Sequence, residues 1–319
     1  MKTSTDTTPI YDAYWNFACE RQNIFFARLR NQPFPWSANT ILQEYRFTNP
    51  YRVTDRVSQY LIKSVIYSGG NYSPEDCLFR ILLFKFFNRI ETWHALDSAL
   101  GDISYKSYDR AKYEMVLDRL LNENAKIYSA AYIMPSGKSS FGFKQKHRNN
   151  LCLIELMMKE HLTTKIAKLT SLKGLYDLLL AFPTIGKFLA FQYAIDINYS
   201  ELCDFNEMSF VVAGPGAQRG IDKCFSNRKH DYAYIIRFVA ENQESEFAKR
   251  RLQFKTLFGR SLQLIDCQNL FCEIDKYARV AFPEANSKIR RTRIKQRFKP
   301  NSEKIDYFFP PKWGLFIKT

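Results

Sequence analysis

The chain has little of what metal sites and disulfide frameworks require. Only four of its 319 residues are histidine, and its seven cysteines are an odd number without a CxxC pair. Because zinc sites place histidine and cysteine at short, regular spacings, no metal or other cofactor is predicted. The cysteines stand mostly in apolar or helical contexts, which is typical of free thiols in a reducing cytoplasm.

Long apolar runs and a nucleotide-binding loop are also missing. No apolar run reaches about 18 residues, the minimum for a membrane span, and the first residues, MKTSTDTTPIYDAYW, hold no apolar core of signal-peptide length. We therefore expect a soluble, cytoplasmic protein with no membrane partner, and we expect a monomer. Ser136-Gly137-Lys138-Ser139 is not a Walker A loop, because GxxxxGK[ST] would need glycine at Tyr132, and this excludes a P-loop kinase on this chain.

Positive charge and aromatic side chains are abundant. Lys and Arg number 47 against 32 Asp and Glu, which gives a net charge of +15, and 16% of the residues are aromatic. Such an excess of positive charge predicts a polyanionic partner, with DNA favoured over an acidic membrane surface. The many Phe and Tyr residues are consistent with base-stacking surfaces. A solvated basic surface without a partner would show the same composition.

Apolar residues recur mostly at helical spacing, which predicts a mainly α fold with two helical lobes and a cleft between them. We expect helices over 11–29, 77–90, 188–197 and 263–277. The predicted domains are an N-terminal helical extension (1–40), a main helical domain (41–285), and a basic arm with an aromatic tail that packs back on the body (286–319).

The segment 178–223 holds two glycine turns with basic residues behind them. The first turn joins two apolar helices in a hairpin over 182–197, and amides at the start of the second helix would point at an anion. Together the two turns predict contacts to a DNA backbone through Thr184, Gly186, Lys187, Gly214, Gly216, Arg219 and Lys223. An ordinary αα-hairpin followed by a Gly-Pro-Gly loop is the alternative interpretation.

Two polar clusters interrupt the apolar pattern. The first surrounds a helix predicted to begin at about Val53, where Arg52 and Arg56 would share one face. The second lies on the late helix, and amides and carboxylates so near a core need partners. The first cluster is interpreted as a recognition site or a salt-bridged helix cap, and its members are Asn49, Arg52, Asp55, Arg56 and Gln59. The second cluster is interpreted as an active-site wall or as structural hydrogen bonds, and its members are Gln268, Asn269, Glu273 and Asp275.

Two further segments concentrate cations. A Gly/Ser-rich loop over 133–150 carries Lys144 and Lys146 beside Phe141 and Phe143, and such a loop could cover a nucleic-acid backbone or insert between bases. Seven cations within 288–299, among them Arg290, Arg291 and Arg293, predict phosphate contacts. A plain solvated run would look the same.

Several of these segments resemble a known family. FTNPYRVTDRVSQYLI, KFFNRIETW, FVVAGPGAQRGIDKCF, QNLFCEIDKYARV and the terminal PPKWGL are similar to phage-associated DNA base hypermodification proteins. That group includes alpha-glutamyl/putrescinyl thymine pyrophosphorylases and the helical domain of hydroxymethyluracil DNA kinases. The resemblance implies a helix-hairpin-helix DNA glycosylase-like fold. In this chain Thr184 stands where that hairpin usually has its first glycine, and Asn206 stands near the position of the usual catalytic aspartate.

The resemblance implies enzymes that either excise a modified pyrimidine from DNA or transfer a group onto it. We predict a DNA glycosylase that flips out a hypermodified or glucosylated base of phage DNA, such as glucosylated hydroxymethylcytosine, as an anti-phage defence. A transferase that replaces pyrophosphate on hydroxymethyluracil with an amine or amino acid is the first alternative, and a non-catalytic binder of modified DNA is the second. The predicted catalytic residues are Asp55, Glu273 and Asp275; the predicted base or sugar contacts are Asn49, Tyr51, Arg52, Arg56, Gln59, Asn88, Gln268 and Asn269.

Overall fold

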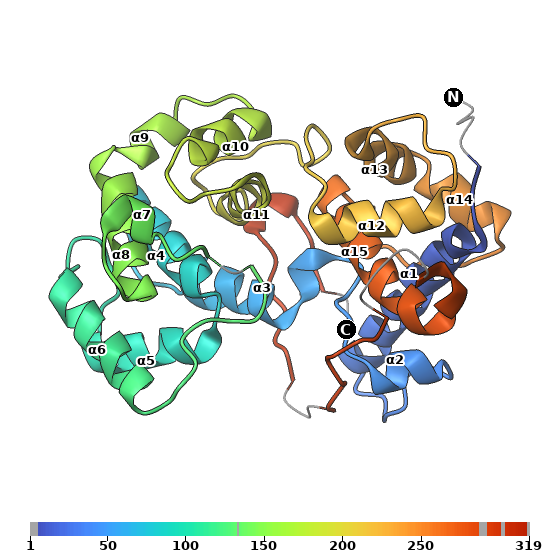
Figure 1. Ribbon diagram of the computed structural model, residues 1–319, viewed down its shortest axis with the longest axis horizontal. Helices are drawn as coiled ribbons and strands as arrows, with labels where there is room; N and C mark the ends of the chain where they lie inside the picture. Colours follow the sequence, from blue (N-terminus) through green and yellow to red (C-terminus); the bar gives the residue numbers. More distant parts are fainter. Residues whose placement is uncertain (1–5, 133, 287–291, 301–303, 318–319) are drawn as a thin grey trace. The chain divides into compact units, whose positions relative to one another are not determined.

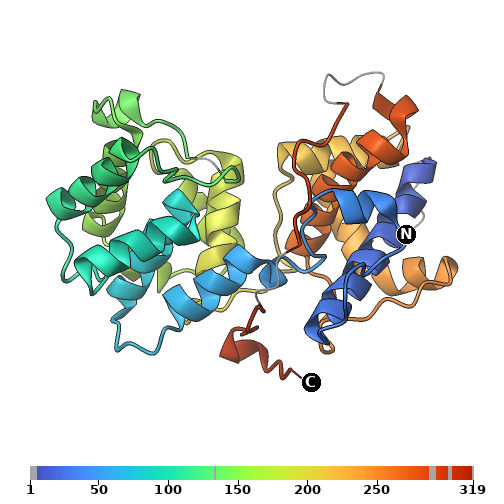
Figure 2. The same cartoon turned by 90° about the horizontal axis from the view of Figure 1, so that it is seen from below.

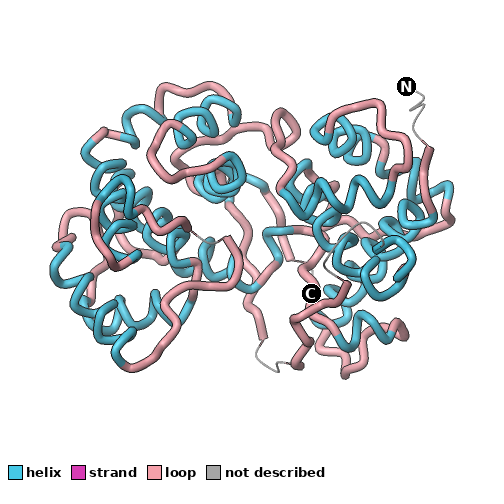
Figure 3. The backbone as a smooth tube through the Cα atoms, viewed as in Figure 1, coloured by secondary structure: helices cyan, strands magenta, loops and turns pink. Residues whose placement is uncertain are grey.

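The computed structural model describes residues 6–132, 134–286, 292–300 and 304–317. Within these ranges the chain consists of helices and connecting loops, without a β-strand, as Figure 3 shows. Three isolated β-bridges, such as the one between Thr7 and Phe225, are the sole β-type pairings in this part of the chain. The predicted mainly α fold is therefore confirmed.

Contacts divide the chain into two compact units. Unit 1 comprises 1–55, 210–306 and 315–319, and unit 2 comprises 56–209 and 307–314. Each unit is thus assembled from segments that are distant in sequence. The cleft between two lobes and the domain ranges 1–40, 41–285 and 286–319 stay predictions.

Unit 1 is built around one long helix, α15, against which α1, α12 and α13 pack (Figure 1). The buried face of α15 presents Leu270, Phe271 and Ile274, and the Phe271 ring lies 4.5 Å from that of Tyr14 on α1. The helices of unit 1 are α1 (Pro9–Leu29), α2 (Thr40–Glu44), η1 (Arg52–Thr54), α12 (Pro215–Cys224), α13 (Tyr232–Glu241), α14 (Gln243–Lys249), α15 (Leu264–Ala281) and η3 (Pro283–Asn286).

Unit 2 packs its helices around α4, which contacts α8 and α11. The sequence Ser73-Pro74-Glu75-Asp76 is typical of a helix start, and the structure shows a capping box between Ser73 and Asp76 there. The helices of unit 2 are α3 (Arg56–Tyr60), the π-helix η2 (Leu61–Ile66), α4 (Pro74–Phe87), α5 (Ile90–Leu100), α6 (Arg110–Asn122), α7 (Lys138–Phe141), α8 (Lys146–Lys159), α9 (Leu162–Ile166), α10 (Leu172–Leu180), α11 (Lys187–Ile197) and η4 (Pro311–Trp313).

The predicted hairpin within 182–197 is formed by α10 and α11, which lie side by side (Figure 1). Thr184 takes the left-handed backbone conformation, with φ of 67°. Glycine adopts this conformation without steric cost, and a β-branched residue does so rarely. The tight turn that usually starts with glycine therefore forms with threonine, at the expense of local backbone strain.

The prediction of a continuous helix from about Val53 is wrong. Arg52–Thr54 form one 3₁₀ turn, and Asp55 then adopts an extended conformation with ψ of 143°. A new helix begins at Arg56 and continues into a π-helix. Arg52 and Arg56 consequently do not share one helical face, because Asp55 breaks the helix between them.

The structure also shows how three further segments fold. The Gly214-Pro215-Gly216 turn is the start of α12, with Gly214 as N-cap. The charged segment 242–257 has a helical pattern, and the helix formed there, α14, ends at Lys249. The aromatic segment 229–238, whose pattern alone fits a short strand or a helix, forms α13 from Tyr232.

Candidate functional site

Glu273 on α15 ties the loop around Thr48 to the core of unit 1. Its Oε2 accepts a hydrogen bond from the Thr48 amide at 3.0 Å and pairs with Lys276 Nζ at 2.6 Å. The side chain is only 6% exposed. Glu273 thus has both an amide donor and a cation at hand.

Asp55 lies near Glu273, but its surroundings differ from those of Glu273. Its Oδ1 accepts from the Asn49 amide at 3.0 Å. Burial raises the pKa of Asp55 to about 7, and the negative charge of Glu273 acts in the same direction. The Asn49 hydrogen bond and the charges of Arg21 and Arg52 oppose this rise. Asp55 is therefore a carboxyl group that titrates near neutral pH.

Arg21 holds this arrangement together, although the sequence analysis did not single it out. From α1 its guanidinium donates to the carbonyls of Thr48 and Phe47 and to Asn49 Oδ1, at 3.0–3.1 Å. Asn49 in turn donates from Nδ2 to the Thr54 carbonyl. The sequence signal that could have identified Arg21 was its charge among the aromatic residues of a helix assigned to the core.

Asp266 is a buried acidic residue close to Arg52, and the sequence analysis did not identify it. Its Oδ1 accepts from the Arg52 amide at 2.8 Å and its Oδ2 from the Gln263 amide at 3.0 Å. Burial raises its pKa to about 6. The neighbouring Tyr51 donates its hydroxyl proton to the Arg260 carbonyl. Tyr51 and Arg52 are buried, and these contacts fix the segment that leads to Asp55.

Asp275, predicted as catalytic, is surrounded by cations. It pairs with Arg279 at 2.6 Å and with Arg219 and Lys223 at 3.2 Å each. Burial opposes ionisation, but the hydrogen bond from Arg279 and the three positive charges hold the pKa of Asp275 below its usual value. Two cations predicted to contact DNA, Arg219 and Lys223, thus join α12 to α15.

Replacing Asp275 by asparagine is expected to lower the free energy of unfolding by about 3 kcal/mol, because three partly buried cations lose their shared counter-charge. The folded pKa is lowered, so this stabilisation is present above about pH 4 and is lost as pH falls further. Thermal melts at pH 7 measure the effect, with Glu284→Gln on the exposed surface as control. A variant that melts like the wild type would contradict the structural role.

The amides predicted to recognise a base lie in different settings. Gln268 is fully buried and donates to Cys272 Sγ at 3.1 Å, whereas Asn269 is half-buried. In unit 2, Gln59 accepts from the Phe308 amide at 2.7 Å. Asn88 accepts from Lys85 Nζ at 2.8 Å. Arg56 also belongs to unit 2 and is half-exposed.

The hairpin presents the residues predicted to hold a DNA backbone. Gly186 and Lys187 are exposed, and Gly186 caps α11 without a side-chain hydrogen bond to the helix amides. The buried Thr184 hydroxyl has no hydrogen-bond partner in the part of the chain that is described. These features leave the start of α11 open to an anion.

The other predicted backbone contacts are spread over both units. In unit 1, Gly214 is buried and Gly216 half-buried, while Arg293 is exposed. In unit 2, Lys144 is exposed and Lys146 half-buried at the start of α8. Arg290 and Arg291 lie outside the described residues.

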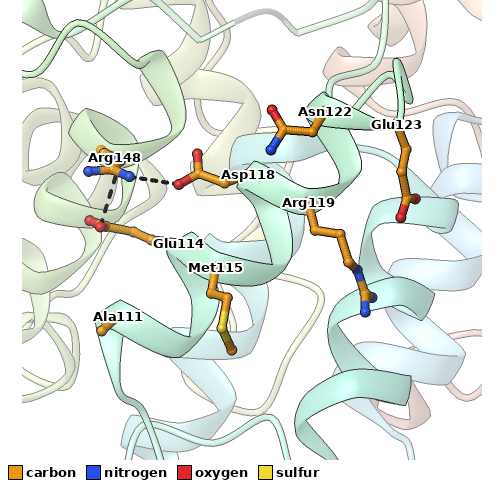
Figure 4. A pocket seen from close by; sticks show the side chains of 8 residues that line it. All are labelled: Ala111, Glu114, Met115, Asp118, Arg119, Asn122, Glu123 and Arg148. Carbon is orange, nitrogen blue, oxygen red and sulfur yellow. Dashed lines mark hydrogen bonds and ion pairs between the residues drawn. The ribbon is translucent and has the colours of Figure 1, made fainter.

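Unit 2 also has an open surface hollow along α6, shown in Figure 4. Within it, Arg148 of α8 is held by Asp118 at 2.6 Å and Glu114 at 3.7 Å. The carboxylates in this hollow disfavour a phosphate ligand. Its lining residues are Ala111, Glu114, Met115, Asp118, Arg119, Asn122, Glu123 and Arg148.

No group of three His, Cys, Asp or Glu side chains that could hold a metal ion is found among the described residues. None of the helices described is both long and apolar enough to cross a membrane.

Comparison with known proteins shows the family to which the chain belongs. Residues 8–287 match the family described as the helical domain of 5-hmdU DNA kinase, and the chain belongs to that family. The resemblance deduced from the sequence motifs is thereby confirmed.

A curated relative is the 5-hmdU DNA kinase of Bacillus phage SP10, which is 24% identical over 288 residues. The match covers 84% of this chain and 45% of the relative, so the chain spans less than half the length of that protein. No solved structure matches the chain.

Proposed function

We propose that the chain is an enzyme that modifies a pyrimidine of the hydroxymethyluracil type in DNA, with Asp55 as its acid–base group. The observation that carries the proposal is the Asp55 carboxyl, whose pKa burial raises to about 7. A group that titrates near neutral pH can accept and release a proton during turnover. The family description and the name of the phage relative supply the substrate class.

The step assigned to Asp55 is proton removal from a nucleophile that attacks the exocyclic carbon of the base. In this substitution an amine forms a bond to that carbon, and the bond from the carbon to a pyrophosphate oxygen breaks. The leaving pyrophosphate takes the electron pair, and the Asp55 carboxylate accepts the proton that the amine loses. Cations stabilise such a leaving group, and Arg21 and Arg52 are the cations whose charge acts on Asp55.

The phosphoryl transfer named for the phage relative is not assigned to this chain. Its Ser136-Gly137-Lys138-Ser139 segment lacks the first glycine of a Walker A loop. Lys138 instead begins the four-residue helix α7. The part shared with the relative is the part described as helical, which favours base handling over phosphoryl transfer.

Excision of the base is the second candidate, because the same carboxyl could orient a water molecule toward C1′ of a flipped nucleotide. The α10–α11 hairpin favours it, since a helix-hairpin-helix element was expected for a DNA glycosylase-like fold. Neither the family description nor the relative's name mentions excision, so modification ranks first. A non-catalytic binder of modified DNA is disfavoured, because binding alone does not need a carboxyl group with a raised pKa such as that of Asp55.

The hairpin is the element that we assign to DNA-backbone binding. The start of α11, where Gly186 and Lys187 are exposed, offers one phosphate both the helix dipole and the charge of the Lys187 ammonium. The strained Thr184 sits in the turn between the helices. Strain of this kind is common where a backbone approaches a ligand closely.

Lys187→Gln is expected to weaken DNA binding about equally for all sequences and to reduce the slope of log affinity against log salt by about 1. Fluorescence anisotropy with a labelled duplex at several salt concentrations measures both quantities. Lys173→Gln is the matched control, because Lys173 lies on α10 and is already paired with Asp177 at 2.6 Å. An unchanged salt slope in Lys187→Gln would remove this residue from the DNA contact.

The proposed chemistry is tested with duplexes that differ at one base: thymine, 5-hydroxymethyluracil, its pyrophosphate ester, or glucosylated hydroxymethylcytosine. Each is incubated with the protein and with amine donors such as putrescine and glutamate, then digested and analysed by mass spectrometry. A new nucleoside from the pyrophosphate ester supports modification. Released base with alkali-labile sites would establish excision, and no change in any duplex would overturn the enzyme assignment.

A further inference from the structure

A short segment of unit 2 carries two tyrosines, each of which has one aromatic neighbour and one cation. Tyr128 stacks on Phe87, with ring centroids 5.1 Å apart, and Lys146 Nζ lies 4.1 Å from its ring centroid. Tyr132 stacks with Phe188 at 5.8 Å, and Lys85 Nζ lies 4.8 Å from its ring. Tyr128, Tyr132 and Phe188, named here the aromatic strip, are all partly exposed.

Phe188 joins the strip to the hairpin. It is the second residue of α11 and directly follows Lys187. Tyr132, on the segment after α6, therefore lies beside the start of α11. Figure 2 shows the helices of unit 2 from a second side. The strip and the phosphate site assigned to the hairpin are consequently neighbours on unit 2.

A buried polar network holds the segment that carries Tyr132. Lys85 on α4 pairs with Asp196 on α11 at 3.1 Å, and both side chains are at most 4% exposed. Asn88 accepts from Lys85 and donates from Nδ2 to Ser129 Oγ at 3.1 Å. Burying an ion pair contributes little net stability. Its clearest effect is to fix Asn88 and, through it, the backbone around Ser129.

The two tyrosines are fixed individually as well. Tyr132 adopts the left-handed backbone conformation with φ of 53°, which is unfavourable for a bulky residue. The Tyr128 hydroxyl accepts from Asn150 Nδ2 at 2.8 Å. These constraints fix the positions of both half-exposed residues.

Lys146 supplies a positive charge beside the ring of Tyr128. The side chain is half-buried, and burial lowers its pKa. Among the residues that the structure describes, no carboxylate forms an ion pair with it. Such a cation is suited to an external anion, and a phosphate next to a stacked base provides one.

We propose that the aromatic strip binds unpaired bases of a DNA strand by stacking, while Lys146 and Lys187 contact its phosphates. Aromatic rings interleaved with cations are the arrangement by which proteins hold single-stranded nucleic acid. The net charge of +15 favours this ligand over an apolar peptide. The inference rests on the proposed function, because a base that is modified inside a duplex must leave the stack and its neighbours must be held.

The test is binding of a single-stranded oligonucleotide that contains 2-aminopurine, whose fluorescence is quenched when it stacks. Tyr132→Leu is expected to weaken binding at least about 5-fold and to reduce the quenching, because one stacked base is lost. Tyr72→Leu is the matched control, since Tyr72 is also half-exposed and also lies against an α4 cation, Arg80 at 4.0 Å. Thermal melts of both variants establish that they are folded.

The outcomes separate this inference from the proposed function. If the wild type quenches 2-aminopurine and Tyr132→Leu binds and quenches equally well, the strip is not the stacking site and the proposed function is unaffected. If the wild type binds neither single-stranded nor duplex DNA, both are overturned. Should Tyr132→Leu fail to fold, Phe188→Leu at the other side of the strip provides the same comparison.

Discussion

Gly220→Ala is expected to prevent unit 1 from packing and to yield little folded protein. A Cβ at Gly220 would lie 1.9 Å from the carbonyl oxygen of Phe271 and 2.8 Å from its carbonyl carbon. Both atoms belong to the backbone of α15, so no side-chain rotation relieves the clash. Helices α12 and α15 would have to separate, which opens the core between them. The free energy of unfolding is therefore expected to fall by about 4–5 kcal/mol. Soluble yield, circular dichroism and thermal melting measure this effect.

Gly216→Ala provides the matched control in the same helix. Its Cβ would meet Cys272 Sγ at 3.0 Å and Cys272 Cβ at 3.3 Å, and a side chain can move by a few tenths of an ångström. Alanine also favours a helix over glycine by up to about 1 kcal/mol. Gly216→Ala is therefore expected to fold, with a melting temperature close to that of the wild type. Equal melting of the two variants would show that the close approach of α12 to α15 is not needed.

The elements that the sequence predicted well are those whose signals are local. The start of α4 follows from serine, proline and aspartate at the cap positions, and the start of α11 follows from the hairpin before Lys187. The apolar spacing of 263–277 likewise predicts most of α15. In each case neighbouring residues in the chain make the interactions that define the element.

What the sequence could not reveal depends on partners distant in sequence. A helical continuation from Arg52 to Gln59 was plausible by spacing, but Asp55 turns away to accept from the Asn49 amide. The sequence pattern left Asp275 in an active-site wall or in structural hydrogen bonds, because Arg219 and Lys223, more than fifty residues earlier, could not be placed against it. Arg21 looked like part of an apolar helix for the same reason.

Asp55→Asn is expected to slow base modification at about pH 8 by roughly 10²–10⁴-fold, because an amide cannot accept the proton of the nucleophile. Asparagine keeps the Oδ1 acceptor for the Asn49 amide, so the loop is expected to stay in place. In the wild type the carboxyl must be ionised to act as a base. The rate should therefore rise with pH through about 7 and level off above it, and the variant should lack this rise. Single-turnover rates on the modified duplex measure both effects.

The stability of the same variant decides whether Asp55 acts in chemistry or in folding. The folded pKa, about 7, lies above that of an unfolded aspartate, near 4, so the folded state holds more protons between these values and its stability falls as pH rises across them. Asparagine cannot ionise, and Asp55→Asn should melt at a higher temperature than the wild type at about pH 8 and at the same temperature at about pH 4. Asp266, with its pKa raised to about 6, contributes alike in both proteins and cancels in the comparison. A slow variant that is also less stable at every pH would make Asp55 a structural residue and would contradict its assignment as the acid–base group.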